Sequence, residues 1–194
     1  MRIGFIGIGK MGLPTARNLA RGIVFAAFAA AAFNLFADTA VAAQPSLESR
    51  IQKLEDEAAI RNLLVEYGHD LDTQDLVGYS KLFAKDGTWT GGIGSAQGPE
   101  GILAMLQKAF GKDPPYDPKK VRSFHLLTNF HIQVDGDRAT ASSKWTFFGR
   151  SDDNKLVPRL AGHYDDTFVR EGGQWKFKSR VAPRDIPNPT EDGK

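Results

Sequence analysis

The sequence predicts an α+β fold in which a curved, mostly antiparallel sheet wraps round N-terminal helices. Two observations lead to this prediction. Apolar side chains recur at helical spacing between about residues 46 and 110, and from Val121 onward they alternate with a period of two. Three short polar segments, DGD, SDDN and EGG, divide the alternating part into strands joined as hairpins. Helices followed by an antiparallel meander are typical of the α+β class.

The first half of this region predicts helices. Ser46 can cap a helix that runs to about Leu71. Its apolar residues recur at roughly helical spacing, at Leu47, Ile51, Leu54, Ala58, Leu63, Leu64 and Tyr67. A short helix is expected over about residues 75–83, and DGTWTGGIG indicates one extended, glycine-rich strand. GPEGILAMLQKAF then predicts a helix with Pro99 at its first position, which the proline-rich loop KDPPYDPKK ends. Four strands follow: FHLLTNFHIQV, RATASSKWTFFG, LVPRLAGHYDDTFVR and QWKFKSRV.

Residues 1–43 are expected to form a leader separate from this domain. The run GFIGIGKMG places Gly7, Gly9 and Gly12 in the Gly-x-Gly-x-x-Gly pattern of a dinucleotide-binding turn. Residues 1–22 also resemble the start of the 3-hydroxyisobutyrate dehydrogenase family. No second parallel strand follows, and no acidic ribose-binding residue stands at a strand end about 20 residues on. The sequence therefore predicts no cofactor.

The rest of the leader is typical of a secretory signal. Ile23 to Phe36 is almost wholly apolar, Arg17 and Arg21 precede it, and small residues follow. Cleavage after Ala42 or Ala43 would place the domain in the periplasm or outside the cell, whereas an uncleaved chain would be cytoplasmic. A buried or amphipathic leader helix and a fused start of the gene are the alternatives. The apolar run is short for a membrane span, which needs about 20 residues.

Composition limits the classes of function. The chain has a net charge of +2, but residues 1–43 hold four basic side chains and one acidic side chain, so the remainder is near −1. Nucleic-acid binding therefore lacks electrostatic support. The absence of cysteine excludes disulfides, thiol catalysis and Cys-ligated zinc. We expect one domain over residues 44–184, followed by a flexible tail over 185–194.

The order and spacing of several segments resemble the SnoaL-like family of the nuclear transport factor 2-like superfamily. These segments are AIRNLLVEYGHDLDTQD, LFAKDGTWTGG, GPEGILAML, HLLTNFHIQVDGDRATASSKW and AGHYDDTFVREGGQWKFKSR. The resemblance covers about residues 50–182 and implies a cone-shaped barrel for a small hydrophobic or cyclic molecule. WTGGIGSAQGPEG and GQWKF are most similar to the hexachlorocyclohexane dehydrochlorinases, and scytalone dehydratases are more distant.

Sheets of this family often bury their outer face against another copy. Because Trp145, Phe147 and Phe148 put apolar groups on both sides of one strand, we expect a homodimer or homotrimer.

Both of these enzyme groups use an Asp–His dyad, which the resemblance places at Asp72 and His125. A carboxylate that accepts the Nδ1 proton fixes the imidazole tautomer and leaves Nε2 to abstract a proton. The implied activity is a cofactor-independent elimination or isomerisation. Alternatively, Asp72 could end the first helix or cap the next one, and His125 could be a hydrogen-bonded strand residue.

Further residues are candidates for contact with the substrate. They are Tyr67, Trp89, Ser143, Trp145 and His163. Trp89 matches an aromatic residue that lines the dehydrochlorinase cavity, and His163 could instead be solvated. Ser143 and Leu71 stand where scytalone dehydratase has a second His and a Tyr, so that enzyme's substrate is not expected. Lys178 or Arg180 could match a basic residue of the dehydrochlorinase's last strand, and the sequence does not decide between them.

Strand parity leaves the direction of His125 open. In an unbroken strand His125, Asn129 and His131 share one face, opposite an apolar face that includes Phe130. His125 would then point away from an apolar cavity, unless a bulge near Leu127–Asn129 reverses the parity or an oligomer buries the outer face. His125 and His131 lie about 20 Å apart along the strand, too far to share a metal, and no metal site is expected.

Three functions remain from the sequence. A lyase or isomerase predicts a hydrogen bond between Asp72 and His125. A non-catalytic protein of the same fold that binds a small hydrophobic ligand predicts a cavity without a paired base. A nicotinamide-dependent dehydrogenase predicts a parallel sheet with Gly7–Gly12 at its crevice.

Overall fold

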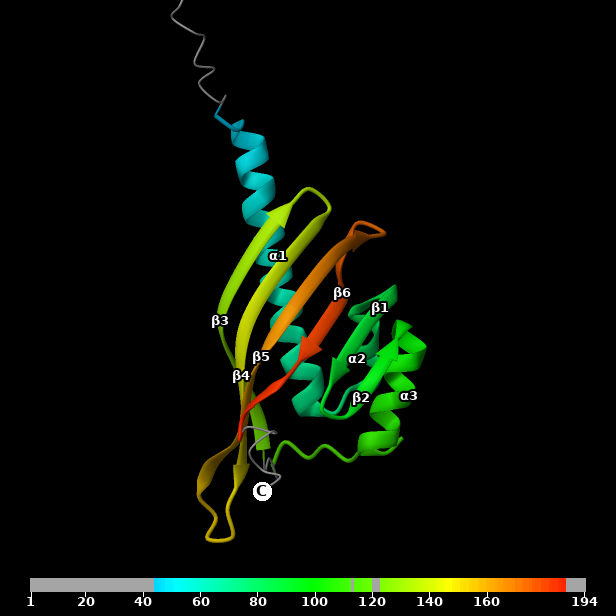
Figure 1. Ribbon diagram of the computed structural model, residues 1–194, viewed down its shortest axis with the longest axis vertical. Coiled ribbons are helices and arrows are strands. Elements are labelled where there is room, and N and C mark those ends of the chain that lie inside the picture. The colour runs from blue at the N-terminus through cyan, green and yellow to red at the C-terminus, as the bar shows by residue number, and fades with distance from the viewer. Residues whose placement is uncertain (1–43, 113, 120–122, 188–194) are drawn as a thin grey trace, which may run out of the picture. The chain divides into compact units, whose positions relative to one another are not determined.

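The computed structural model of the 194-residue chain describes residues 44–112, 114–119 and 123–187 (Figure 1). The predicted leader, with its glycine motif and apolar run, lies outside the described residues, as does the end of the predicted tail. The described part is a curved, unclosed sheet of seven strands with helices packed against it, as the α+β prediction requires. No helix among these residues is long and apolar enough to cross a membrane.

The helices begin at residues that satisfy their first free N–H groups. α1 runs over Leu47–Thr73, and the Ser46 side chain accepts a hydrogen bond from the Ser49 N–H at 3.2 Å. Asp75 caps α2, Leu76–Lys81, through the Gly78 N–H at 2.8 Å. α3, Gly98–Phe110, carries proline in its first turn. The three predicted helices are thus confirmed, with ends shifted by up to a few residues.

The strands follow the chain order closely. They are β1 Phe83–Gly91, β2 Gly94–Gln97, β3 Ser123–Asp135, β4 Arg138–Arg150, β5 Leu156–Glu171, β6 Gln174–Ala182 and β7 Arg184–Ile186. The sheet order is β2-β1-β6-β5-β4-β3, with β7 beside β5. Only β1 and β6 pair in parallel among the described strands. This is the predicted meander, not the parallel sheet that a dehydrogenase needs.

Two details differ from the sequence prediction. DGTWTGGIG is not one strand: the chain turns at Gly92 and Ile93, and β1 and β2 form a hairpin. The structure also adds β7, so Asp185 and Ile186, which the sequence places in a flexible tail, pair with β5.

The core lies between the inner side of α1 and the concave face of the sheet. Ile60, Leu64 and Tyr67 of α1 are at most 1% exposed, and they meet aromatic residues from the strands. Phe83 stacks on Phe177 with ring centroids 5.1 Å apart. This packing fixes α1 against the sheet and so positions the last turns of the helix, where Asp72 lies.

Candidate functional site

A bulge in β3 determines which side chains face the helices. The register with β4 shifts between Thr128 and His131, and Asn129 has a positive φ of 56°. Before the bulge, His125 and Leu127 lie on the inner face. After it, Phe130 and the alternate residues that follow take that face, and His131 is exposed. The bulge that the parity argument required is therefore present, and it turns His125 inward.

Asp72 and His125 are hydrogen-bonded to each other. The Nδ1 atom of His125 lies 2.7 Å from Oδ1 of Asp72, and the His125 backbone N–H donates to both carboxylate oxygens at 2.9 and 3.0 Å. The side chain of His125 is 20% exposed, and that of Asp72 is 25% exposed. The His125 ring packs beside Phe147 of β4, with centroids 4.9 Å apart. Because the carboxylate accepts the Nδ1 proton, the Nε2 atom of a neutral His125 has a free lone pair.

A second register shift turns Arg180 inward from β6. Phe177 pairs with Phe168, but Ser179 pairs with Thr167, so Lys178 is the extra residue. Lys178 is consequently exposed and pairs with Asp86, whereas Arg180 is fully buried. Of the two basic residues that the sequence left open, Arg180 lies on the inner face.

Arg180 is held rigidly by an ion pair and by aromatic rings. Its Nε and Nη2 atoms both donate to the Asp166 carboxylate at 2.7 Å. The guanidinium carbon lies 3.8 Å from the ring centroid of Tyr67 and 3.9 Å from that of Tyr164. Burial alone would lower the pKa of Arg180, but the Asp166 charge and hydrogen bonds outweigh it and raise the pKa. Arg180 is therefore a permanent cation inside the fold.

Two buried donors on the inner face have no hydrogen-bond partner among the described residues. They are the Nη1 atom of Arg180 and the hydroxyl of Ser143. Ser143 lies opposite Tyr164 in the β4–β5 pair, and Tyr164 contacts the Arg180 guanidinium, so both donors border the same ring. Buried polar groups normally have partners, so the two unpaired donors mark a place suited to a polar ligand atom or a water molecule.

Tyr67 connects α1 to two other elements. Its hydroxyl accepts hydrogen bonds from the Tyr79 hydroxyl at 2.6 Å and from Trp89 Nε1 at 3.1 Å. Burial raises the pKa of Tyr79 well above its ordinary value, so this phenol stays protonated. Trp89 is 6% exposed and is fixed by this contact, which makes both Tyr67 and Trp89 parts of the rigid wall behind Arg180.

The last two sequence candidates lie on different faces. Trp145 is buried on the inner face, and its Nε1 donates to the His163 carbonyl oxygen at 3.0 Å. The His163 side chain lies on the outer face, where Nδ1 is 2.9 Å from Asp185 of β7. The structure therefore brings Tyr67, Trp89, Ser143 and Trp145 towards the inner face with Asp72 and His125, but not His163.

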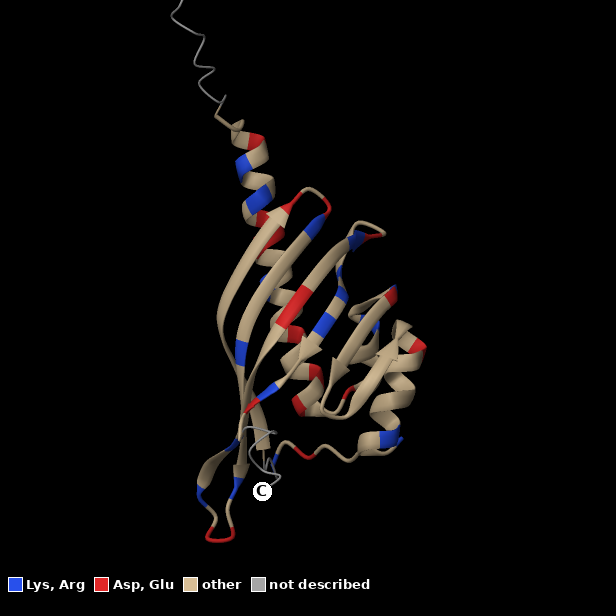
Figure 2. Cartoon of the chain, in the orientation of Figure 1, with Lys and Arg blue, Asp and Glu red and all other residues tan. Residues whose placement is uncertain are grey.

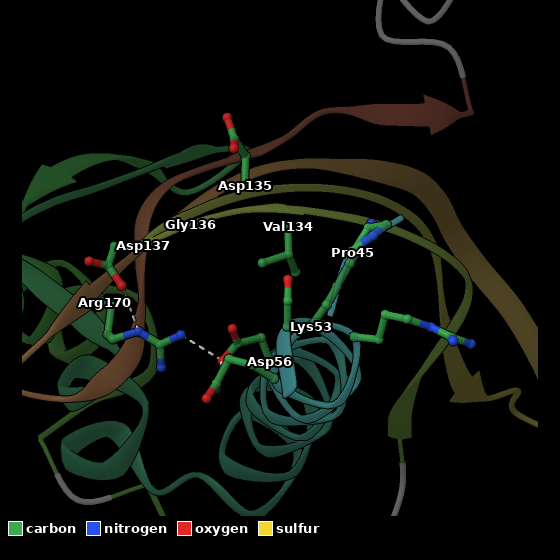
Figure 3. A pocket seen from close by; sticks show the side chains of 11 residues that line it. Pro45, Lys53, Asp56, Val134, Asp135, Gly136, Asp137 and Arg170 are labelled. Atoms are coloured by element: carbon green, nitrogen blue, oxygen red, sulfur yellow. Dashed lines mark hydrogen bonds and ion pairs between the residues drawn. The ribbon is translucent and has the colours of Figure 1, made fainter. Parts of the chain in front are cut away.

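Two open pockets lie elsewhere on the molecule, and neither is lined by Asp72 or His125. The larger, of about 580 Å³, lies between the start of α1 and the β3–β4 turn (Figure 3). Its buried carboxylate, Asp56, accepts hydrogen bonds from Arg170 at 2.6 Å and from Trp175 at 3.0 Å. Burial would raise the pKa of Asp56, but these hydrogen bonds lower it on balance. This cluster ties α1 to β5 and β6, and the Asp56 carboxylate has its hydrogen-bond partners within the protein.

The second pocket, of about 410 Å³, opens on the outer face of the sheet beside His131. Within the described residues no group of His, Asp and Glu could hold a metal ion.

Sequence reasoning missed the polar residues that fix the site from behind. Asp166, Tyr79 and Tyr164 carry the hydrogen bonds and ring contacts around Arg180 and Tyr67. In the sequence, Asp166 is one of two adjacent acids in a strand, and only strand parity distinguishes it from its exposed neighbour Asp165. The alternation of DDTF with Phe168 on the inner face was the one signal that could have placed Asp166 inward.

In a comparison with protein families, residues 52–181 match the SnoaL-like domain. Among curated proteins, the uncharacterized protein Rv2910c of Mycobacterium tuberculosis strain H37Rv is 30% identical over 141 residues, which cover 69% of this chain and 88% of that protein. An uncharacterized protein of Mycobacterium bovis matches to the same extent.

Solved structures show the same fold. An NTF2-like protein with a cystatin-like fold from Novosphingobium aromaticivorans has a TM-score of 0.62 at 24% identity, and the match covers 76% of this chain and 95% of that one. A hexachlorocyclohexane dehydrochlorinase, LinA-type3 from Novosphingobium barchaimii LL02, has a TM-score of 0.58 at 23% identity, with 71% and 92% covered. The β subunit of a putative aromatic-ring-hydroxylating dioxygenase from N. aromaticivorans has a TM-score of 0.56 at 23% identity, with 72% and 92% covered. At these identities the likeness is one of fold.

Proposed function

Since this chain belongs to the SnoaL-like domain family, we propose that it is a cofactor-independent lyase or isomerase that acts on a small hydrophobic or cyclic molecule. The observation that carries this proposal is the 2.7 Å contact between His125 Nδ1 and Asp72 on the inner face of the sheet. A histidine oriented in this way by a carboxylate is a suitable general base.

In the proposed elimination, Nε2 of His125 takes a proton from a carbon next to the one that bears the leaving group. The electron pair of the broken C–H bond forms the new C=C bond, and the leaving group departs with the electrons of its own bond. Asp72 holds the ring in the required tautomer and stabilises the imidazolium that forms. In an isomerisation, the same proton would be returned at another carbon of the substrate.

Arg180 is suited to the charge that develops on the leaving group or on an adjacent oxygen. Tyr67, which contacts the guanidinium, and Asp72 lie five residues apart on α1, about 7.5 Å along the helix axis. The unpaired Nη1 atom and the Ser143 hydroxyl are preoriented donors in a buried environment, where such donors act strongly on developing negative charge.

The test begins with a screen of halogenated and hydroxylated cyclic compounds for release of halide or water. On a compound that is turned over, His125→Ala and Asp72→Asn should each lower kcat at least about a hundredfold. The double variant should be little worse than either single variant, because the two side chains act as one unit. His131→Ala is the matched control, since His131 lies on the same strand but on the outer face. Full activity of either dyad variant would contradict the assignment.

Binding without catalysis is the second candidate function, and the two unpaired buried donors favour it independently of the dyad. It predicts that a ligand raises the melting temperature of the wild type and of Asp72→Asn alike, without turnover. Ser143→Ala should weaken that stabilisation.

We also propose that the protein self-associates and is exported. On the outer face, Phe124 and Phe148 stack with centroids 5.3 Å apart, which supports the expected homodimer or homotrimer. A monomeric mass by light scattering at micromolar concentration would count against it. Export would be tested by the mass of the mature protein, which should begin at residue 43 or 44.

A further inference from the structure

α1 carries a second apolar stripe, on the side that faces away from the sheet. Its apolar residues are Leu47, Ile51, Leu54, Ala58 and Val65, spaced by four and three residues. Arg61 occupies the place between Ala58 and Val65, and its guanidinium lies over the Phe130 ring of β3, 5.6 Å from the centroid. All six are exposed, and Leu47 and Leu54 are 64% and 66% exposed. The buried positions of the same helix include Ile60 and Leu64. At 3.6 residues per turn, the stripe lies roughly 140° round the helix from them.

The stripe belongs to a part of α1 that projects beyond the sheet. The first turns of the helix extend past the turns that join β3 to β4 and β5 to β6 (Figure 1). Both signs of charge occur there, with the basic Arg50 and Lys53 between the acidic Glu48 and Glu55 (Figure 2). A helix that is solvated on its outer side needs no continuous apolar stripe there. A near-balanced charge pattern fits a copy of itself better than a strongly charged partner or an anionic membrane.

The residue types on the stripe specify one kind of pairing. With Leu47 and Leu54 at heptad position d, the a positions are Ile51, Ala58 and Val65, and Arg61 occupies the third d position. β-Branched residues at a with leucine at d favour parallel, two-stranded coiled coils. We propose that α1 pairs with α1 of a second copy of this chain, parallel and in register, through this stripe.

The charged residues beside the stripe agree with a parallel arrangement. Arg50 occupies position g and Glu55 occupies position e of the next heptad, and both are exposed. In a parallel pair, Arg50 of each copy faces Glu55 of the other, which gives two attractive contacts. In an antiparallel pair centred on Leu54, Glu55 would instead meet the partner's Glu55.

Disulfide trapping tests the arrangement directly, because the full chain has no cysteine. Leu47→Cys, Leu54→Cys and Arg61→Cys should each give a covalent dimer on mild oxidation, since a parallel pair places every d position opposite itself. Val77→Cys is the control, at an exposed α2 position away from the stripe. Dimers from Leu54→Cys alone would overturn the parallel register. No dimer from any of the three would overturn the interface, whether the stripe is bare or covered by residues 1–43.

Charge exchange provides an independent measurement on the cysteine-free protein. In sedimentation equilibrium, Arg50→Glu and Glu55→Arg should each raise the dimer dissociation constant about five- to tenfold, and the double variant should restore it. Phe148→Glu, which alters only the outer face of the sheet, should leave disulfide trapping on α1 unchanged. Failure of the double variant to restore association would overturn the pairing of Arg50 with Glu55, while the proposed chemistry at His125 would be unaffected.

Discussion

Asp70 makes the stability of the α1–α2 corner depend on pH. Asp70 lies in the last turn of α1 and is 4% exposed. Burial, together with the charges of Glu66 and Asp75, raises the pKa of Asp70 from 3.8 to about 6. The carboxylates of Asp70 and Asp75 both lie beside Gly78, so the two acidic groups are close to each other. At neutral pH the folded protein therefore holds an unfavourable buried charge.

The sign and size of the effect follow from this pKa. Because the folded state binds the Asp70 proton more tightly than the unfolded state, this stabilisation is complete below about pH 3.8 and is lost as the pH rises through about 6. The difference between the two pKa values corresponds to about 3 kcal/mol. Screening at this helix end reduces the expected effect to about 1–2 kcal/mol. Asp70→Asn replaces the carboxylate with a neutral group of the same shape, so it should raise the free energy of unfolding by that amount near pH 8 and change it little near pH 4.

Urea unfolding followed by tryptophan fluorescence measures this difference. The Asn-minus-Asp difference in unfolding free energy should be positive near pH 8 and should shrink towards zero near pH 4. Asp152→Asn, in the exposed β4–β5 turn, is the matched control and should show a difference close to zero at both pH values. An equal effect of Asp70→Asn at the two pH values, or a loss of stability near pH 8, would refute this account of the corner.

Three further predictions concern the bulge, the buried ion pair and the leader. Asn129→Val should destabilise the fold by about 1–2 kcal/mol because of the positive φ, whereas Asn129→Gly should be neutral or stabilising; equal urea midpoints would contradict a left-handed residue there. Arg180→Met should lower the free energy of unfolding by about 3–5 kcal/mol, since it leaves Asp166 buried without its partner, and adding Asp166→Leu should recover most of the loss in the same assay. Deletion of residues 1–43 should change the unfolding free energy by less than about 0.5 kcal/mol, because the described core packs without them; a loss of several kcal/mol would show that the leader is part of the fold.

The elements could be predicted from the sequence because their signals are local. The period-two pattern and the three polar turns determined β3 to β6 almost to the residue. The β1–β2 hairpin was missed since the GGIG run indicates turn and extended backbone alike. β7 was missed because three residues after Pro183 are too few for periodicity to show. Its pairing depends on β5, which is more than twenty residues earlier in the chain.

The candidate site was predictable only in part, because two single extra residues decide which side chains face the helices. In β3, Asn129 was a usable signal, since asparagine tolerates a positive φ better than other side chains. In β6, Lys178 gives no such signal, and without the register shift Ser179 rather than Arg180 would face inward. A bulge forms where the packing on both sides of it is better than in the regular register, which is a property of the whole sheet. The sequence could therefore propose His125 conditionally but could not choose between Lys178 and Arg180.

The same limit applies to α1, where the apolar period alone does not tell which side of the helix is buried. Leu47, Ile51, Leu54 and Ala58 do recur at helical spacing, but the structure leaves them exposed and buries Ile60, Leu64 and Tyr67 on the other side. Periodicity shows that side chains share a stripe, not what covers that stripe. Asp56 stands between Leu54 and Ala58 in the sequence, but it is buried whereas they are exposed. The early turns of α1 therefore face the sheet with the side that carries Asp56. The hydrogen bonds of Asp56 to Arg170 and Trp175 fix the rotation of the helix. That rotation turns Tyr67 towards Arg180, and it leaves the outer stripe available for a second copy.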